Sequence, residues 1–460
     1  MKPVIDLGGK KVLVVGLART GIATALFCAE RGARVTATEA RPEAEIAETA
    51  AKLRAVGVTL ELGGHRAETF VEQDLIVPSP GVSPLLPTLA AARAIGVPVW
   101  SEIELAWRFL RGRLICITGS NGKTTTTSLI GHILETAMLP VQIAGNIGTP
   151  LISRVDVSSD SSFTVMEASS FQLESISAFR PDVAVLLNVT PDHLDRHGSV
   201  EAYGRAKARM FENQTEEDAA VINADDAMAP QYAPAGPRVL WFSRQKRVAS
   251  GCYLRGEEIV FRSDGAECVL LERKIIGLRG SHNIENVLAA AAAARLAGVE
   301  PSAIAEGVRT FAGVEHRIEY VATISGVEYF NDSKATNVDA TLKALDAFPG
   351  NVLVILGGKD KGSDYRILRP ALRSHARMAL LIGSAADKIE TDLAGVIPVE
   401  RAGTMARAVE AASRRAQPGD TVLLAPACAS FDQFDNYEHR GRVFKQLVRE
   451  LGKEHAAKGA

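Results

Sequence analysis

The stretch Leu114-Ile-Cys-Ile-Thr-Gly-Ser-Asn-Gly-Lys-Thr-Thr-Thr-Thr127 decides the fold of the central part of the chain. Its apolar start predicts a buried strand, and the apolar positions spaced along 129–137 predict one face of a helix. Between them, the glycine-rich turn 119–124 lets several backbone N–H groups point at one anion, which the helix N-terminus also favours. The stretch therefore predicts a site for the phosphates of a nucleoside triphosphate.

Two side chains of this turn carry the expected chemistry. Lys123 is placed to reach the β- and γ-phosphates, and Thr124 is placed to ligate Mg²⁺. The common form of this motif has a glycine where Ile117 stands here, so we expect a shorter variant of the loop. An ordinary turn is the alternative, but it leaves the consecutive threonines at the helix start unexplained.

Length and composition limit the class of protein. A chain of 460 residues is too long for one compact core, so we expect two or three domains. The net charge of −2 argues against sequence-independent binding of nucleic acid. The five cysteines include no Cys-x-x-Cys pair, which is typical of a reducing compartment. We find neither an N-terminal signal stretch nor a run of 18 apolar residues, so we expect a cytoplasmic protein without membrane insertion.

The first hundred residues read as a Rossmann-like unit. A strand ending at Gly16, a glycine-containing turn, a helix and a second strand ending at Glu39 predict its opening. Ala18 replaces the second glycine of the dinucleotide fingerprint, so we expect a phosphate-bearing ligand other than NAD, unless the glycines only form a tight turn. Glu39 would accept from a ribose or a base edge. Ser79 and the Gly81 amide follow a later strand and are further candidates.

Three side chains of the middle region are candidates for metal or substrate contacts. Glu167 ends a predicted strand, where a second Mg²⁺ ligand is expected, although a surface glutamate is the alternative. His193 lies between two aspartates after another strand and is a candidate metal or substrate contact, whereas we expect His197 at the surface. Lys207 falls on a predicted helix, and spacing alone favours a solvent-facing lysine.

Asn283 and Asn286 begin an alanine-rich helix and present their amides on the same face. They either contact a nucleobase or cap the helix, and spacing does not decide between these roles. Before them, residues 251–274 alternate with turns and predict β-hairpins.

The last third predicts a second mostly parallel sheet, because strands and helices alternate there. The strands are expected at 328–330, 352–356, 379–382 and 421–424. Polar loops follow three of these strands and carry Lys334, Lys361 and Ser430. Because such loops meet at one edge of a parallel sheet, they predict a site for a substrate with carboxylates, unless they are unrelated surface loops.

Several motifs together resemble those of the Mur ligases and their folylpolyglutamate synthetase relatives. They are Thr118-Gly-Ser-Asn-Gly-Lys-Thr-Thr125, Glu167-Ala-Ser-Ser-Phe-Gln172, Asn188-Val-Thr-Pro-Asp-His193, His282-Asn-x-x-Asn286 and Glu315-His-Arg317. Two C-terminal motifs, Asn331-Asp-Ser-Lys-Ala-Thr-Asn337 and Pro426-Ala-Cys-Ala-Ser-Phe-Asp-Gln-Phe434, resemble the branch of this family that adds D-glutamate. The Asp-Asn-Pro-Arg signature of the branch that adds diaminopimelate or lysine is absent from the sequence. The resemblance runs almost end to end.

The resemblance implies an α/β fold of three domains. Residues 1–101 would form a Rossmann-like domain for the UDP-sugar, and residues 314–460 a Rossmann-like domain for the amino acid. Residues 102–313 would form a P-loop ATPase-like parallel sheet with a small β-rich part, for ATP and Mg²⁺. The implied reaction joins D-glutamate to UDP-N-acetylmuramoyl-L-alanine through an acyl phosphate, giving ADP and phosphate, in peptidoglycan precursor synthesis. We expect a monomer.

The resemblance also implies roles for individual residues. Those expected to bind ATP are Gly119, Ser120, Asn121, Gly122, Lys123, Thr124, Thr125, Asn283, Asn286, Arg317 and Asp332. Those expected around the UDP-sugar are Arg19, Thr20, Glu39, Arg41, Ser79 and Gly81, with Asn146 and Gln172 toward the sugar. Those expected to place the amino acid are Lys334, Thr336, Lys361, Ser430 and Phe431. The implied catalytic residues are Lys123, Glu167, His193 and Lys207. Two Mg²⁺ ions would be held by Thr124, Glu167, His193 and Lys207, the last as a carbamate.

Two alternatives stay open at this point. One is another carboxylate–amine ligase of the same superfamily, which is either a different Mur step or a folylpolyglutamate synthetase. The other is a non-catalytic protein that binds ATP as a switch.

Overall fold

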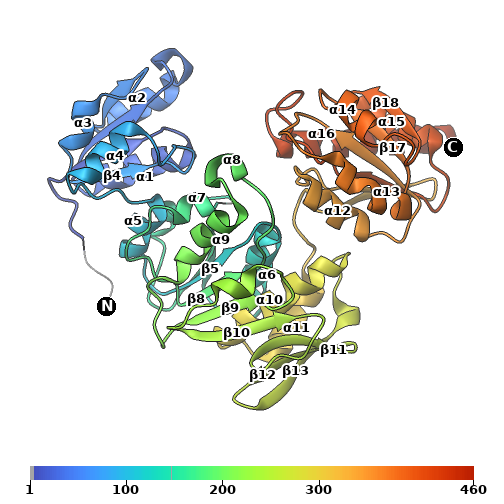
Figure 1. Ribbon diagram of the computed structural model, residues 1–460, viewed down its shortest axis with the longest axis horizontal. Coiled ribbons are helices and arrows are strands. Elements are labelled where there is room, and N and C mark those ends of the chain that lie inside the picture. The colour runs from blue at the N-terminus through green and yellow to red at the C-terminus, as the bar shows by residue number, and fades with distance from the viewer. Residues whose placement is uncertain (1–4, 147, 460) are drawn as a thin grey trace. The chain divides into compact units, whose positions relative to one another are not determined.

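The computed structural model describes residues 5–146 and 148–459 (Figure 1). Its contacts divide the chain into two units. The first contains the chain up to Ile276 together with Glu285–Phe311, and the second contains Gly277–Ile284 and the chain from Ala312 onward. Residues 1–4 and 460, the ends of the expected first and third domains, lie outside the described part. The segment Gly277–Ile284, expected in the central domain, groups with the second unit.

The N-terminal part of the first unit is a parallel sheet in the order β3-β2-β1-β4. Its elements are β1 Lys11–Val15, α1 Arg19–Glu30, β2 Arg34–Glu39, α2 Ala47–Ala55, β3 Thr59–Leu62, α3 Ala67–Val71, β4 Leu75–Pro78 and α4 Pro87–Ala94. Gly21 is required in α1, because a Cβ there would lie 1.9 Å from the Gly16 carbonyl oxygen. This close approach of α1 to the turn after β1 confirms the predicted Rossmann-like opening.

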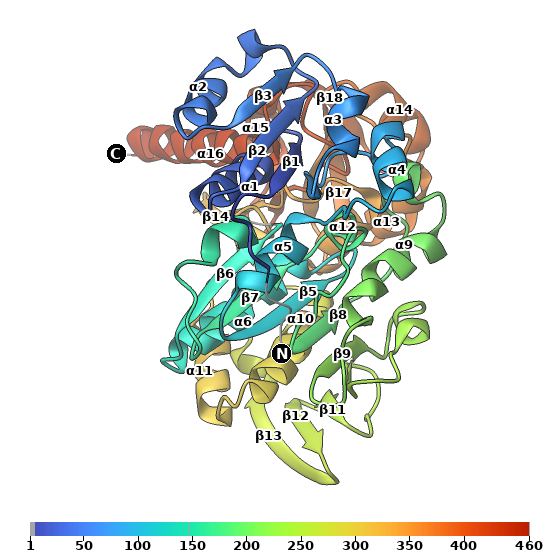
Figure 2. The ribbon, with the colours of Figure 1, turned by 90° about the vertical axis from the view of Figure 1, so that its left-hand side faces the viewer.

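The rest of the first unit is built on a nine-stranded sheet in the order β13-β12-β11-β10-β9-β8-β5-β7-β6. The pairs from β6 to β11 are parallel, and β11, β12 and β13 pair antiparallel, which confirms the predicted hairpins. Figure 2 shows β5, β7 and β6 side by side, and α6 packs against β6 and β7.

The strands of this sheet are β5 Arg113–Thr118, β6 Val141–Gly145, β7 Phe163–Glu167, β8 Val183–Leu186, β9 Ala219–Asn223, β10 Arg238–Ser243, β11 Gly251–Arg255, β12 Glu258–Ser263 and β13 Ala266–Glu272. Its helices are α5 Glu102–Phe109, α6 Lys123–Thr136, α7 Ser170–Leu173, α8 Leu194–His197, α9 Val200–Ala208, α10 Ser281–Leu296 and α11 Pro301–Thr310. The first residues of α10 belong to the second unit.

The second unit is a six-stranded sheet in the order β14-β15-β19-β16-β17-β18. All its strands pair in parallel except β14, which forms an antiparallel hairpin with β15 that the sequence did not predict. The strands are β14 Glu319–Ile324, β15 Val327–Asn331, β16 Val352–Gly357, β17 Ala376–Ile382, β18 Val399–Gly403 and β19 Thr421–Leu424. The helices are α12 Val338–Asp346, α13 Arg369–His375, α14 Ala386–Asp392, α15 Met405–Arg415 and α16 Tyr437–Gly459.

Alternate residues of β16 enter two separate cores on the two faces of this sheet. Val352 and Val354 pack in one core, and Leu353 and Ile355 pack in the other. Burial on both faces is typical of a parallel sheet with helices on each side, and it leaves the strand-end loops as the exposed edge. In the part of the chain that the structure describes, we find no helix long and apolar enough to cross a membrane.

Candidate active site

The phosphate loop joins β5 to α6 in a conformation that only glycine adopts readily. Gly119 has a φ of +158° and Gly122 a φ of +87°, in the left-handed region. A Cβ on Gly122 would lie 2.4 Å from the Asn286 side-chain oxygen, so the loop packs directly on the start of α10. The Thr126 hydroxyl donates to the same oxygen at 3.3 Å. Within the first unit, Asn286 thus supports the loop from inside α10.

Two lysines meet at the loop. The Lys123 Nζ donates to the carbonyls of Gly119 and Ser120, both at 2.8 Å. From α9, the Lys207 Nζ donates to the same Gly119 carbonyl at 2.8 Å, and this side chain is 1% exposed. Burial, and the charge of Lys123 second, hold the pKa of Lys207 well below its usual value. Spacing alone favoured a solvent-facing lysine, and that expectation is wrong because α9 packs its Lys207 face inward.

The expected magnesium ligands Thr124 and Glu167 touch each other. Glu167 ends β7 and is 2% exposed. One of its oxygens accepts from the Thr124 hydroxyl and the other from the Asn146 side-chain amide, both at 2.8 Å. A hydroxyl and a carboxylate at a phosphate loop are hard oxygen donors, which fit Mg²⁺. Asn146, expected near the sugar, therefore also contacts the expected metal ligand.

Asn188 supports the phosphate loop from the end of β8. Its side chain accepts from the Asn121 N–H at 2.8 Å and donates to the Asn121 carbonyl at 3.1 Å. The Ser120 hydroxyl also donates to the Thr190 carbonyl at 3.0 Å. Asn188 belongs to one of the motifs named above, but no role is predicted for it from the sequence. A side chain that bonds to the backbone of a distant loop leaves no periodic pattern in the sequence.

His193 and His197 lie at the two ends of the short helix α8. His193 has a φ of +52°, and its side chain is 44% exposed, so it can meet a ligand. Its ring centre lies 4.9 Å from that of Phe171. The His197 side chain is only 5% exposed and shares a 3.0 Å hydrogen bond with the Ser170 hydroxyl. The expected surface position of His197 is wrong, because its ring packs against those of Phe171 and Tyr203.

Glu39 organises the turn of the expected UDP pocket. Its carboxylate accepts from the Leu17 N–H at 2.7 Å and from the Arg41 N–H and guanidinium, both at 3.1 Å. Burial raises the pKa of Glu39, but the hydrogen bonds from Arg41 and Leu17 outweigh it and lower the pKa to about 2. Glu39 therefore stays ionised and fixes the β1 and β2 ends together. Of the remaining expected residues near this turn, Thr20 is half-buried, and Arg19 and Gly81 are exposed.

Ser79 and Gln172 line one small cavity within the first unit, together with Glu174 and Arg196. The Ser79 hydroxyl donates to the Gly16 carbonyl at 2.8 Å. Gln172 is 3% exposed and forms a capping box with Ser169 at the start of α7. These two expected UDP-sugar residues therefore come together, although they are 93 residues apart in the sequence.

In the second unit, the loops after β15, β16 and β19 meet at one edge of the sheet. The Ala427 N–H donates to the Ala335 carbonyl at 2.9 Å, and Lys359 and Ala429 exchange backbone hydrogen bonds at 2.8 and 3.2 Å. Arg440, 0% exposed on α16, donates to the hydroxyl and the carbonyl of Ser333 and to a carbonyl of the β19 loop. The sequence missed Arg440, because a helical arginine is usually solvated.

The residues expected to place the amino acid differ in exposure. Ser430 is 2% exposed and Phe431 is 68% exposed. Lys361 is exposed, and Lys334 and Thr336 are half-buried. Their loops provide cations and a hydroxyl at one sheet edge, which suits an amino acid with two carboxylates.

Two expected ATP contacts of the second unit, Asn283 and Arg317, line a single cavity with the rings of Tyr320 and Phe330. The buried Arg317 Nε has no hydrogen-bond partner among the described residues, which fits an anionic ligand. Burial raises the pKa of Asp332 to about 7, against the opposing charge of Arg317. In the first unit, the Thr125 hydroxyl is likewise buried without a described partner.

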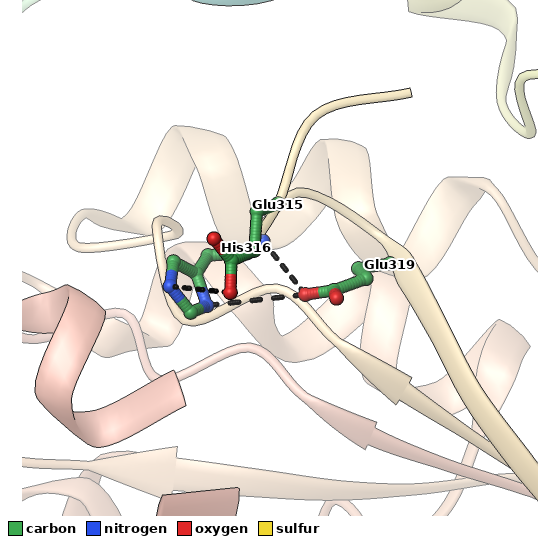
Figure 3. Close-up of side chains that lie close together, drawn as sticks. All are labelled: Glu315, His316 and Glu319. Carbon is green, nitrogen blue, oxygen red and sulfur yellow. Dashed lines mark hydrogen bonds and ion pairs between the residues drawn. The ribbon is translucent and has the colours of Figure 1, made fainter. Parts of the chain in front are cut away.

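Glu315, His316 and Glu319 lie close together at the entry to β14, as Figure 3 shows. The Lys445 Nζ lies 2.6 Å from Glu315 and 2.8 Å from Glu319, so an ammonium already balances both carboxylates. Burial lowers the pKa of His316, and its Nδ1 lies 2.9 Å from the Asn331 side-chain nitrogen. Glu315, Glu319 and Lys445 therefore form an ion-pair network beside His316, and this network anchors the entry to β14 on α16.

Three family models match successive parts of the chain. They are the Mur ligase MurD-like N-terminal domain at residues 10–101, the Mur ligase middle domain at 117–294 and the Mur ligase glutamate ligase domain at 316–428. The UDP-N-acetylmuramoylalanine–D-glutamate ligase of Acidobacterium capsulatum is 54% identical over 447 residues, covering 96% of this chain and 97% of that protein. The enzyme of the same name from Koribacter versatilis is 51% identical, covering 98% and 99%.

Solved structures share the fold at low identity. A pseudomurein peptide ligase type C from Methanothermus fervidus has a TM-score of 0.61 at 19% identity, covering 96% of this chain and all of that one. The UDP-N-acetylmuramate–alanine ligase of Thermotoga maritima has a TM-score of 0.59, also at 19% identity and with the same coverage. With the three matched domains and the near full-length relatives, the chain belongs to the Mur ligase family.

Proposed function

We propose that this chain is an ATP-dependent ligase that joins D-glutamate to UDP-N-acetylmuramoyl-L-alanine in peptidoglycan precursor synthesis. The observation that carries the proposal is the match over nearly the full length to relatives that bear this activity in their names. The phosphate loop and the polar edge of the second sheet fit it, because one part suits a triphosphate and the other a dicarboxylic amino acid. The monomeric state and the cytoplasmic location remain predictions.

The reaction has two chemical steps. The carboxylate of UDP-N-acetylmuramoyl-L-alanine attacks the γ-phosphorus of ATP, which releases ADP and leaves an acyl phosphate. The amine of D-glutamate then attacks the acyl carbonyl, the amide forms and phosphate leaves. Both steps bring anions together, so catalysis rests on positioning and on neutralising charge.

Thr124 and Glu167 are the residues that would hold Mg²⁺ beside the phosphates. Mg²⁺ supplies charge that neutralises the transferring phosphoryl group. Lys123, whose Nζ now caps two loop carbonyls, turns to the β- and γ-phosphates when ATP binds. Asn283, Asn286, Arg317 and Asp332 are the further proposed ATP contacts.

Lys207 is proposed to act as a carbamate. The lowered pKa described above increases the fraction of neutral amine, which attacks CO₂ and forms an N–C bond with loss of one proton. The product carries a carboxylate at the end of α9, next to the Gly119 carbonyl that the amine now contacts. With His193, this carboxylate would hold a second Mg²⁺.

The other proposed contacts follow the domains of the family. Arg19, Thr20, Glu39, Arg41, Ser79, Gly81, Asn146 and Gln172 take the UDP-sugar. Lys334, Thr336, Lys361, Ser430 and Phe431 take D-glutamate. The matched family models support domains at 1–101, 102–313 and 314–460, since each model falls inside one of these ranges.

One assay tests the function. The purified protein is incubated with ATP, Mg²⁺ and UDP-N-acetylmuramoyl-L-alanine, and phosphate release is measured with each of a panel of amino acids. We expect D-glutamate to stimulate release and L-glutamate not to. Release with another acceptor or amino acid would favour a different ligase of the superfamily. ATP binding without any stimulated release would favour a non-catalytic switch.

A further inference from the structure

Arg196, on α8, has a guanidinium that is engaged on several sides. Its Nε and Nη2 donate to the two oxygens of Glu174 at 3.2 and 2.5 Å, and its Nη1 donates to the Pro80 carbonyl at 3.0 Å. Its Cζ lies 4.0 Å from the centre of the Phe171 ring. The Arg196 and Glu174 side chains are 15% and 16% exposed, so this pair is largely shielded from water.

Pro80 belongs to the turn after β4 that carries two expected UDP contacts, Ser79 and Gly81. Within its own domain, the turn is bonded to the end of β1: the Ser79 N–H donates to the Val15 carbonyl and the Ser79 hydroxyl to the Gly16 carbonyl, both at 2.8 Å. Arg196 adds a hydrogen bond to this turn from the central domain of the same unit. Arg196 therefore bonds the central domain to a carbonyl that lies between two expected UDP contacts.

The other partners of Arg196 lie near His193 and Gln172, which are expected to contact the second metal ion and the sugar. Phe171 also packs against the ring of His193, 4.9 Å between ring centres, and the Arg196 N–H donates to the His193 carbonyl at 3.1 Å. Glu174 directly follows α7, which presents Gln172. The Arg196 guanidinium thus joins the UDP turn to Glu174 beside the sugar-side helix, and the Arg196 main chain holds the loop that carries His193.

We propose that Arg196 is a positioning residue that fixes the UDP-binding turn relative to the His193 loop. This inference rests on the proposed function, in which one substrate lies across both parts. Such a substrate binds with less ordering of the protein when the two parts are already aligned. Arginine suits this role because its planar fork bonds two oxygens of Glu174, reaches a third acceptor and stacks on an aromatic ring, whereas lysine does none of these together.

The test is Arg196→Lys in the full-length protein, with Arg205→Lys as the matched control. Arg205 is exposed on the neighbouring helix α9. In Arg196→Lys, we expect the KM for UDP-N-acetylmuramoyl-L-alanine to rise about tenfold or more, the factor for losing a hydrogen bond made by a charged group. We expect kcat to fall, the KM for ATP to change less than about twofold, and the control to match wild type.

A second comparison separates positioning from general stability. Glu174→Gln removes the charge of the partner of Arg196 but leaves the Arg196 hydrogen bond to Pro80. Its effect on the KM for the UDP-sugar should therefore be smaller, and it should not add to the effect of Arg196→Lys. Equal rises in all three KM values together with a lower unfolding temperature would overturn the inference, as would Arg196→Lys kinetics equal to those of the control. A wild-type protein that forms no product would overturn the proposed function itself, and with it this inference.

Discussion

Replacing Glu102 by glutamine should remove a pH dependence from the stability of the first unit. Glu102 lies on α5 and is 1% exposed. One carboxyl oxygen accepts from the Ile152 N–H at 2.6 Å, and the other is buried without a hydrogen-bond partner among the described residues. Burial raises the pKa of Glu102 from its ordinary value of 4.5 to about 7. Glutamine has the shape of the protonated acid and keeps the same acceptor.

The sign follows from proton binding. Between pH 4.5 and 7 the folded protein keeps a proton on Glu102 that the unfolded chain has lost, so stability falls as the pH rises. At about 1.36 kcal/mol per pH unit, the full loss is about 3.4 kcal/mol. Because about one unit is already lost at pH 5.5, about 2 kcal/mol remains to be lost by pH 8.5.

Thermal unfolding of wild type and Glu102→Gln at both pH values measures this difference. At about 2 °C per kcal/mol for a large domain, the variant should unfold roughly 3 °C above wild type at pH 5.5, where about one unit of the loss has occurred. At pH 8.5, where the loss is complete, the gain should widen by roughly a further 4 °C. Glu135→Gln, an exposed change on α6, is the control and should follow wild type. A difference in unfolding temperature between wild type and Glu102→Gln that stays the same at both pH values would refute the reasoning that burial raises the pKa of Glu102.

Three further changes test the proposed site. Lys123→Ala should abolish phosphate release while calorimetric binding of the UDP-sugar persists, since the ligands use different loops; near-normal turnover would sink the phosphate-loop assignment. Lys207→Ala should lose most activity and regain part of it with added acetate or propionate, which supply the missing carboxylate; absence of any rescue alongside full loss would count against the carbamate. Lys361→Ala should raise the KM for D-glutamate more than that for ATP, and equal effects would contradict its placement in the amino-acid site.

The clustering of residues that follow the strands could be predicted from the sequence, because parallel sheets place these residues at one edge. In parallel sheets, loops at the carboxyl ends of strands gather at one edge, so Glu167 and the residues near Ser79 could be assigned to edges from the sequence alone. Glycines marked the turns, as at Gly122, where the structure leaves no room for a Cβ. The β14–β15 hairpin was not predictable, because Glu319–Ile324 is partly exposed and lacks a strong apolar run.

Helical site residues were not predictable from pattern. Lys207, Arg196 and Arg440 each reach a loop from a helix. The spacing of residues along a helix does not show whether a basic side chain points toward the interior or the solvent. The family resemblance placed Lys207 in the site, but it named neither Arg196 nor Arg440. Their partners are carbonyls and carboxylates far away in the sequence, and only the folded chain brings these together.

Lys207 and Arg440, both at most 1% exposed, avoid an unpaired charge in different ways, and the difference separates their roles. The Lys207 ammonium donates to one acceptor among the described residues, the Gly119 carbonyl, so burial is poorly offset and, with the charge of Lys123, holds the pKa well below its usual value. The Arg440 guanidinium donates to three acceptors, and although burial lowers its pKa to about 10, it stays charged at neutral pH. A neutral buried amine can react with an electrophile. A charged guanidinium whose N–H groups are already hydrogen-bonded can only hold its partners in place. Burial with few acceptors therefore favours a chemical role for Lys207, and burial with many favours an architectural role for Arg440 in joining the loops of the second sheet.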